Sequence, residues 1–336
     1  MSSWFLLGAH LMSGWKKVTA WSLVASMTLT MLPPTHVEAK QPKLFSLKTG
    51  KFGALGRALG AALKQRSAAV ARKNREIVWR TNYARAMVEA RRDQKMLLVY
   101  FRTRASDAIR NEFEESLRDQ RLFAPMSNMV IVYVPLDAAS AAGGTLLGHP
   151  AFEELQGGPG VALVDLAHQS EDFYGRVVSA LPLSQGKYYR YKADHLGVLL
   201  GLPPGSLTQR TLVFAVRIHP EKPASTVGDL HPVLVEEAKT HAGYQAAIQV
   251  QGHHHWDARF QRLAGLLPFG LRGKEVCAES WANERLVDAA VDCVDSWRQS
   301  SGHWEAVRAS HPVFGYDMQR GANGIWYATG VFGTHD

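Results

Sequence analysis

Cysteine is nearly absent from this 336-residue sequence, and so are the short motifs of several large enzyme classes. Two cysteines, Cys277 and Cys293, are too few for a disulfide-dense scaffold or for a zinc site built from cysteine alone. The sequence also has no Gly-x-Ser-x-Gly nucleophile elbow, no phosphate-binding glycine loop and no recognisable nucleic-acid-binding module. These absences argue against a serine hydrolase of that type, a P-loop enzyme and specific nucleic-acid recognition.

Long apolar runs are missing as well, and none is a comfortable membrane span. The apolar residues 18–32 follow two lysines and precede the small-residue site Val37-Glu-Ala39, an order typical of a secretory signal peptide. We therefore expect residues 1–39 to be a signal peptide and the protein to be secreted or periplasmic. An uncleaved anchor and a translation start at Met12 are the alternatives left open.

Acidic residues are scarce in one segment. Residues 40–76 contain ten Lys or Arg and one acid, whereas residues 77–336 hold 26 Lys or Arg against 28 Asp or Glu. The net charge of +8 therefore belongs mainly to this segment. Its Gly, Ala and Ser content predicts a basic linker over residues 40–78. Because basic residues are attracted to anionic surfaces, contact of residues 40–76 with a membrane or a cell-wall polymer is the alternative.

Strand and helix patterns alternate over residues 79–202. Continuous apolar runs predict strands buried on both faces, with amphipathic helices between them. The expected strands are residues 96–101, 129–136, a run after Pro159 and 174–181, and helices are expected near residues 79–90, 106–117, 152 and 188–200. This order resembles the thioredoxin-like fold, an α/β fold in which Pro159 would match the proline that the family places before a strand.

Thioredoxins carry a Cys-x-x-Cys pair after the first of these strands, because a low-pKa thiolate at a helix start performs disulfide exchange. Here residues 102–109 read Arg-Thr-Arg-Ala-Ser-Asp-Ala-Ile. The resemblance therefore implies a redox-inactive domain that serves as a scaffold, with Ser106 and Asp107 as helix caps. Binding of an extended peptide beside Pro159 is the alternative.

Helical patterns follow the boundary Leu202-Pro-Pro-Gly205. Ser206-x-x-Gln209 is a capping box that opens a helix, and a second helix is expected from about His231 into Val250. His241 on that helix is interpreted as a core or boundary histidine. A third helix is expected to be capped by Asn283 and ended by Gly302, with a buried face made of Val287, Ala290, Val291, Val294 and Trp297.

Five short motifs in residues 203–336 occur in a particular order. They are Gly252-His253 with Arg259 six residues later, Ala278-Glu279, the helix ending at Trp297 followed by Ser300-Ser-Gly-His-Trp304, Phe314-Gly315, and residues 324–333. In this order they resemble the CAP superfamily (cysteine-rich secretory, antigen 5 and pathogenesis-related proteins), specifically its bacterial SCP branch. The resemblance implies a CAP-type α-β-α sandwich, so the chain would combine an α/β and an α+β domain.

CAP domains line a central cleft with two histidines and two glutamates and often bind a divalent metal there. By position, His253, Glu279 and His303 match three of the four, and Ser300 occupies the neighbourhood of the second glutamate. Adjacent side chains of an extended segment point opposite ways, so at most two residues of the three-histidine tract could face one cleft. His253 is chosen from its spacing to Arg259, and His255 is the alternative. The resemblance implies a binding cleft of His253, Glu279, His303 and Ser300, with zinc or another divalent ion held by His253 and His303.

The function implied is an exported two-module protein that binds an extracellular or cell-envelope peptide, glycan or lipid. The alternative is a metal-dependent hydrolase in which Glu279 and Ser300 act in catalysis. The missing second glutamate weakens that alternative. An exported pair of cysteines in one domain predicts a disulfide between Cys277 and Cys293, and two buried free thiols remain the other possibility.

Overall fold

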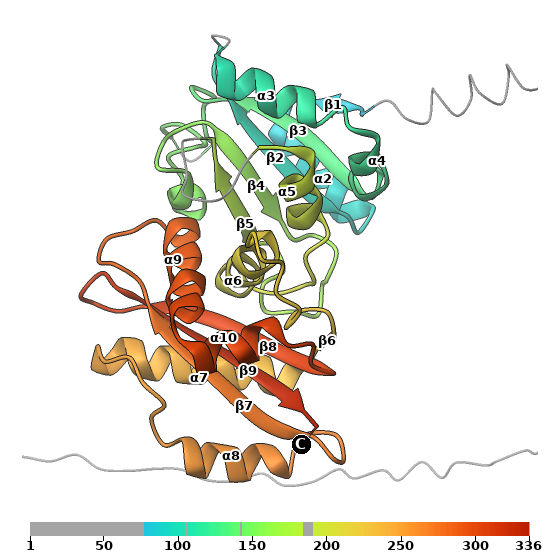
Figure 1. Ribbon diagram of the computed structural model, residues 1–336. Helices are drawn as coiled ribbons and strands as arrows, with labels where there is room; N and C mark the ends of the chain where they lie inside the picture. Colours follow the sequence, from blue (N-terminus) through green and yellow to red (C-terminus); the bar gives the residue numbers. More distant parts are fainter. Residues whose placement is uncertain (1–76, 105–106, 142, 184–190, 336) are drawn as a thin grey trace, which may run out of the picture. The chain divides into compact units, whose positions relative to one another are not determined.

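The computed structural model describes residues 77–335 except 105–106, 142 and 184–190 (Figure 1). The predicted signal peptide and all but the last two residues of the predicted linker lie outside the described residues, and so does the predicted contact with anionic surfaces. The described residues belong to one compact unit of the chain. No helix among them combines the length and apolarity needed to cross a bilayer.

Five strands form the first sheet in the order β1-β3-β2-β4-β5 (Figure 1). Two of them, β1 and β2, run parallel to β3, whereas β4 pairs antiparallel with both β2 and β5. The continuous apolar runs predicted to be buried strands form β2 and β4, in which almost every residue is buried. The bounds are β1 Trp79–Arg80, β2 Met96–Arg102, β3 Met129–Pro135, β4 Gly160–Val164 and β5 Val177–Pro182.

Helices cover both faces of this sheet. Leu98 and Tyr100 of β2 pack in a core with α3, α4 and α5, whereas Leu97 and Val99 pack in a second core with α2 and η1. Asp107 accepts a hydrogen bond of 2.7 Å from the backbone N–H of Arg110 and caps α3, as predicted. The bounds are α2 Tyr83–Arg92, α3 Ala108–Ser116, α4 Gln120–Ser127, the 3-10 helix η1 Pro150–Leu155 and α5 Ala193–Leu200.

Four strands form the second sheet in the order β6-β8-β9-β7, with β6 parallel to β8 and the remaining pairs antiparallel. Residues of α7 and α8 pack on one face, and residues of α9 and α10 pack on the other (Figure 1). The described chain is therefore mixed α/β with two mixed sheets. The bounds are β6 Asp229–Leu230, α7 Pro232–Ile248, α8 Trp256–Ala264, β7 Arg272–Glu279, α9 Leu286–Gln299, α10 Ser301–Arg308, β8 Val313–Arg320 and β9 Trp326–Thr334.

Side chains along β7 point alternately to the two faces of the sheet, so neighbouring residues contact different helices. Val276 and Ala278 enter the core that contains α9, and Glu275 and Cys277 lie on the face covered by α7 and α8. Close approach of α7 to the sheet requires Gly315 on β8, because a Cβ there would lie 2.3 Å from the carbonyl carbon of Leu234. This face of the sheet carries the candidate site.

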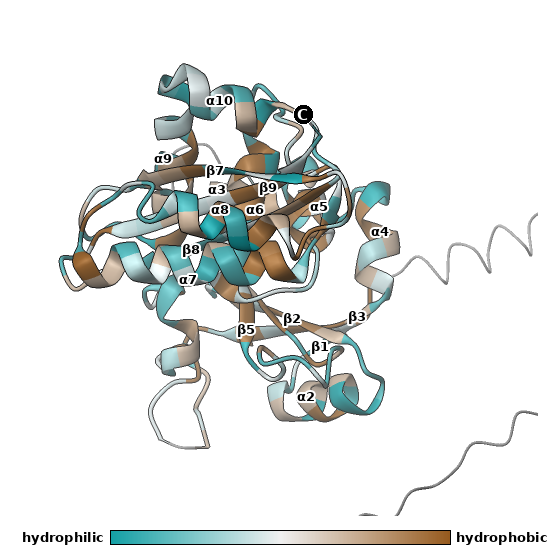
Figure 2. Ribbon diagram, turned by 90° about the horizontal axis from the view of Figure 1, so that it is seen from below, coloured by the Kyte–Doolittle hydropathy of each residue, from teal (hydrophilic) through white to brown (hydrophobic). Residues whose placement is uncertain are grey.

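A further helix, α6 (Leu207–Ile218), packs against both β5 and α9. It opens with the predicted capping box of Ser206 and Gln209. Its Arg210 is buried and donates hydrogen bonds to the backbone carbonyls of Val178, Leu199, Leu202 and Pro203 and to the hydroxyl of Ser179. The helix therefore joins the core beside the first sheet to the core beneath α9. Figure 2 shows hydrophobic segments gathered in the interior of the described chain and hydrophilic segments toward its outside.

The predicted buried face of α9 is confirmed, since all five of its residues are almost fully buried. The predicted caps are wrong. Asn283 adopts a left-handed conformation in a turn, and the carboxylate of Glu154 accepts a 3.1 Å hydrogen bond from the first N–H of α9, at Leu286. Gly302 lies inside α10, and the extended residue Ser300 separates the two helices. The chain becomes helical again because Trp304 and two later residues of α10 pack in the core.

Candidate functional site

Two histidines fifty positions apart in the sequence meet at the second sheet. His253 lies between α7 and α8, and His303 lies in the first turn of α10. Their Nε2 atoms are 3.1 Å apart, and the side chain of His253 is 42% exposed. The structure thus brings together the two residues that the sequence proposed as metal ligands.

The carboxylate beside this pair belongs to Glu275. Its Oε1 lies 2.9 Å from Nδ1 of His253, and its side chain is only 1% exposed. Glu279, which the sequence assigned to the cleft, is exposed at the end of β7. We therefore correct the site carboxylate from Glu279 to Glu275, the residue that faces α8 from the middle of the strand.

Glu275 belongs to a buried network of charges. Its second oxygen accepts a hydrogen bond from Arg259, whose guanidinium also bonds Glu237, and Arg262 reaches Glu237 from outside. Burial alone would raise the pKa of Glu275, but hydrogen bonds from His253 and Arg259 outweigh it and hold the pKa below its usual range. Glu275 is therefore ionised and fixed in place at neutral pH. Arg259, noticed in the sequence only for its spacing to His253, holds it there.

The network determines the tautomer of His253. An ionised carboxylate only accepts hydrogen bonds, so His253 donates its Nδ1–H to Glu275 and presents the lone pair of Nε2 toward His303. Burial, together with the neighbouring His253, lowers the pKa of His303. His303 is therefore suited to be a neutral nitrogen ligand, and Nε2 of His253 faces it.

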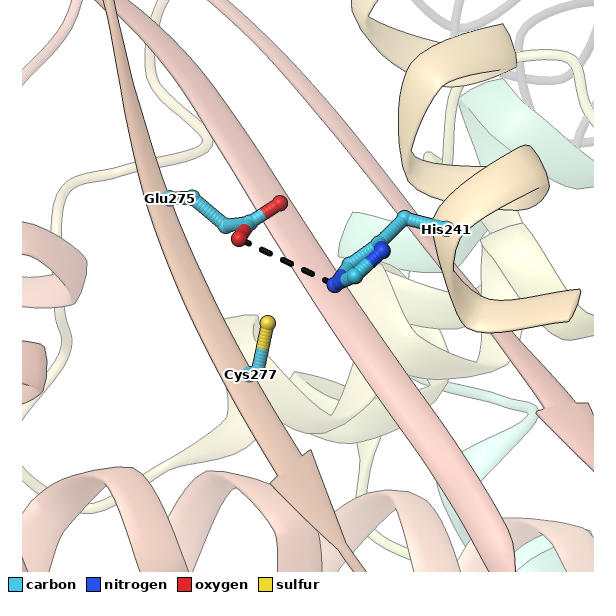
Figure 3. Close-up of side chains that lie close together, drawn as sticks. All are labelled: His241, Glu275 and Cys277. Atoms are coloured by element: carbon cyan, nitrogen blue, oxygen red, sulfur yellow. Dashed lines mark ion pairs between the residues drawn. The ribbon is translucent and has the colours of Figure 1, made fainter. Parts of the chain in front are cut away.

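A buried group beneath this pair could also hold a metal ion (Figure 3). His241, Glu275 and Cys277 place their ligand atoms within 4.8 Å of one another, from α7 and from two alternate positions of β7. His241 is buried as predicted, with Nε2 2.9 Å from the carbonyl oxygen of Gly252 and 3.8 Å from Glu275. Its inclusion in a ligand group was not predicted. The one sequence signal for this group is the Glu-x-Cys spacing, which places two side chains on the same face of a strand.

The predicted disulfide between Cys277 and Cys293 is wrong, since both cysteines are free and buried. Cys277 lies on the α7 face of the sheet, with its Sγ 3.7 Å from Nδ1 of His253. Cys293 belongs to α9 and faces the core on the opposite side of the sheet. The sheet itself separates the two thiols. Burial, the largest cause, raises the pKa of Cys277 far above its usual value, and Glu275 adds to this effect.

The remaining predicted residues do not join the pair through any described contact. The alternative ligand His255 adopts a left-handed conformation and directs Nε2 to the hydroxyl of Tyr244, at 3.2 Å. His254 directs its own Nε2 to the carbonyl oxygen of Val250, at 3.1 Å. Ser300 contributes its carbonyl to the first turn of α10, and its side chain caps neither adjoining helix. Of the three-histidine tract, His253 alone contacts His303 among the described residues.

A cavity of about 230 Å³ lies beside the first sheet, lined by Trp79, Tyr100, Arg102 and Tyr133 among others. His253 and His303 do not line this cavity. The side chain of His253 is 42% exposed, so the histidine pair is reached from solvent.

A scan against protein-family models finds no match, and a search of the curated proteins finds no significantly similar sequence. The interpretation of the site therefore depends on its own residues. These are a pair of imidazoles in contact, a buried, ionised carboxylate that bonds one of them, and a thiol and a third imidazole next to that carboxylate.

Proposed function

We propose that this chain is an exported binding protein of two modules. In this proposal, the module over residues 203–336 is CAP-like and holds a divalent metal between His253 and His303. The ion's open coordination positions take an oxygen atom of an extracellular or cell-envelope peptide, glycan or lipid. The module over residues 79–202 is a thioredoxin-like scaffold without redox chemistry.

The spacing of the two imidazoles is the observation that carries the metal site. Zinc bound by two histidines at about 2.0–2.1 Å in a tetrahedral site separates their nitrogens by about 3.3 Å. The Nε2 atoms of His253 and His303 are already 3.1 Å apart. Metal-ligating histidines usually donate their other ring N–H to a carboxylate, and Glu275 accepts from Nδ1 of His253 in that manner.

The exposed pair suits a metal better than the buried group does. In the buried group, Cys277 must lose a proton from a thiol of raised pKa, and His241 must give up its bond to Gly252. A doubly charged ion would also compete with Arg259 for Glu275. Metal binding by His253 and His303 requires at most the loss of the one proton that lies between their Nε2 atoms. It leaves the hydrogen bond between Glu275 and Arg259 intact.

The strand order of the first sheet supports the thioredoxin-like interpretation, because a parallel βαβ unit is followed by an antiparallel hairpin. Asp107 caps α3 in the region where a redox member carries its nucleophilic cysteine. Helices on both faces of the second sheet support the α-β-α interpretation of residues 203–336.

Hydrolysis is the second candidate, and the open coordination positions of a two-histidine metal favour it. The site carboxylate weighs against it. Glu275 is buried and engaged by Arg259 and His253, so it has no position from which to take a proton from a metal-bound water. Binding without turnover is therefore the function that the arrangement supports best.

Zinc titration by calorimetry tests the metal site. We expect one equivalent of zinc to bind, His253→Ala and His303→Ala each to abolish binding, and His255→Ala, the matched control, to retain it. Glu275→Gln should weaken zinc binding by about 10- to 100-fold while the fold is retained. Cys277→Ser should bind as the parent does. Loss of binding in Cys277→Ser together with retention in His303→Ala would move the ion to the buried group.

Incubation with cell-envelope muropeptides separates binding from hydrolysis. The proposal expects zinc-dependent retention of such fragments without cleavage, and loss of retention in His303→Ala. Zinc-dependent cleavage that disappears in the same variant would establish the hydrolase instead.

A further inference from the structure

The loop that joins α8 to β7 has an unusual composition. The last two residues of α8 and the loop itself, residues 263–271 (Leu-Ala-Gly-Leu-Leu-Pro-Phe-Gly-Leu), form nine consecutive positions without a polar side chain, and Arg262 and Arg272 bracket them. Three of the nine are buried and six are exposed to solvent. An exposed apolar segment bracketed by arginines is not explained by the core of this protein or by the histidine site.

The buried members anchor the loop. Leu263, Leu267 and Leu271 pack in a core with residues of α7 and β9. Leu266 and Phe269 point outward instead: Leu266 is 54% exposed, and Phe269 is fully exposed. The two outward side chains are therefore held away from the protein by their buried neighbours.

A tight turn presents Phe269 at the tip of the loop. The N–H of Leu271 donates a hydrogen bond of 3.1 Å to the carbonyl oxygen of Pro268, which closes a four-residue turn. Gly270 supplies the positive φ of 82° that such a turn requires at its third position. Because the turn and the buried leucines fix the backbone, little conformational entropy would be lost if the side chain of Phe269 were buried in an apolar environment.

The charged residues next to this loop in the sequence are all basic, and one of them, Arg262, also pairs with Glu237. Between Asp257 and Glu275 the sequence contains three arginines and one lysine and no acid. Arg259 is buried in the site network, and Arg262, Arg272 and Lys274 reach the surface or lie near it. Long basic side chains can lay their apolar stems along a bilayer while their charged ends stay at the headgroups. Exposed apolar side chains next to basic ones suit a surface that is anionic outside and apolar inside.

We propose that this loop docks the protein onto anionic lipid bilayers, with Phe269 and Leu266 inserted at the interface and the flanking basic side chains on the lipid headgroups. A narrow convex tip offers little area to a protein partner, whereas a bilayer accepts a single aromatic side chain. This docking is independent of the metal site, and it concerns a segment different from the basic residues 40–76.

Vesicle sedimentation of the full chain provides the test. Phosphatidylcholine vesicles containing one quarter phosphatidylglycerol should bind the protein, and pure phosphatidylcholine vesicles should bind it far more weakly. Phe269→Ser should reduce partitioning about tenfold, equivalent to about 1.4 kcal/mol, and the double change with Leu266→Ser should reduce it further. Val227→Ser is the matched control, because Val227 is 73% exposed away from this loop, and its partitioning should not change.

A dye that reports polarity, attached at Phe269→Cys, follows insertion directly, because both native thiols are buried. We expect a shift to shorter emission wavelength on anionic vesicles. If the dye remains in water and Phe269→Ser binds vesicles as the parent does, the inference is overturned and any vesicle binding belongs to another segment. A change of oligomeric mass in Phe269→Ser without a change in vesicle binding would overturn it too, and would assign the loop to self-association.

Discussion

Replacement of Arg259 by methionine is the most direct test of the network that supports the site. Arg259 is buried between Glu237 and Glu275, whose side chains are also buried. Methionine keeps much of the volume but leaves two carboxylates without their shared cation. Breaking a buried ion pair by removal of one partner typically costs about 3–5 kcal/mol. We expect a loss of that size in the free energy of unfolding at pH 7, measured by urea denaturation.

The pH dependence of this loss tests its cause. Without Arg259, Glu275 loses a hydrogen bond that lowers its pKa, and burial, which raises the pKa, gains weight, so the stability of the variant decreases as the pH rises through that raised pKa. The difference between parent and variant should therefore shrink between pH 7 and pH 5. Arg262→Met is the matched control: Arg262 contacts the same Glu237 but is 54% exposed, so about 1 kcal/mol or less is expected. A loss below about 1 kcal/mol for Arg259→Met, or one that is equal at both pH values, would refute the reasoning.

Four other predictions follow from the described residues. Cys277 and Cys293 should resist a thiol reagent in the native protein and titrate as two thiols after unfolding, and reductant should leave the melting temperature unchanged. Trp297→Ala should cost about 3–5 kcal/mol in urea denaturation, because the ring is fully buried. Arg210→Met should cost about 2 kcal/mol, because it leaves several buried carbonyls without their donor. Burial lowers the pKa of four histidines: His219, His241, His303 and His311. The melting temperature should therefore be highest above about pH 6.5 and should fall as the pH drops through the lowered pKa values.

Local patterns in the sequence determined much of the secondary structure. The buried face that ends at Trp297 follows from a 3.6-residue period, and the caps Asp107 and Ser206 follow from hydrogen bonds to N–H groups three residues away. In both cases the information lies within a few neighbouring residues. The pairing of His253 with His303 was expected only from the order of motifs that resembles the CAP superfamily, because the two residues lie fifty positions apart in the sequence.

The tertiary structure alone decided which carboxylate and which thiol belong to the site. Glu275, Cys277 and Glu279 alternate along one strand, so the sequence gives all three the same face. The packing of Arg259 from α8 selects Glu275, and the sheet separates Cys277 from Cys293. Periodicity specifies the face of an element, but the partner across that face comes from a distant segment, and only the packed fold brings the two together.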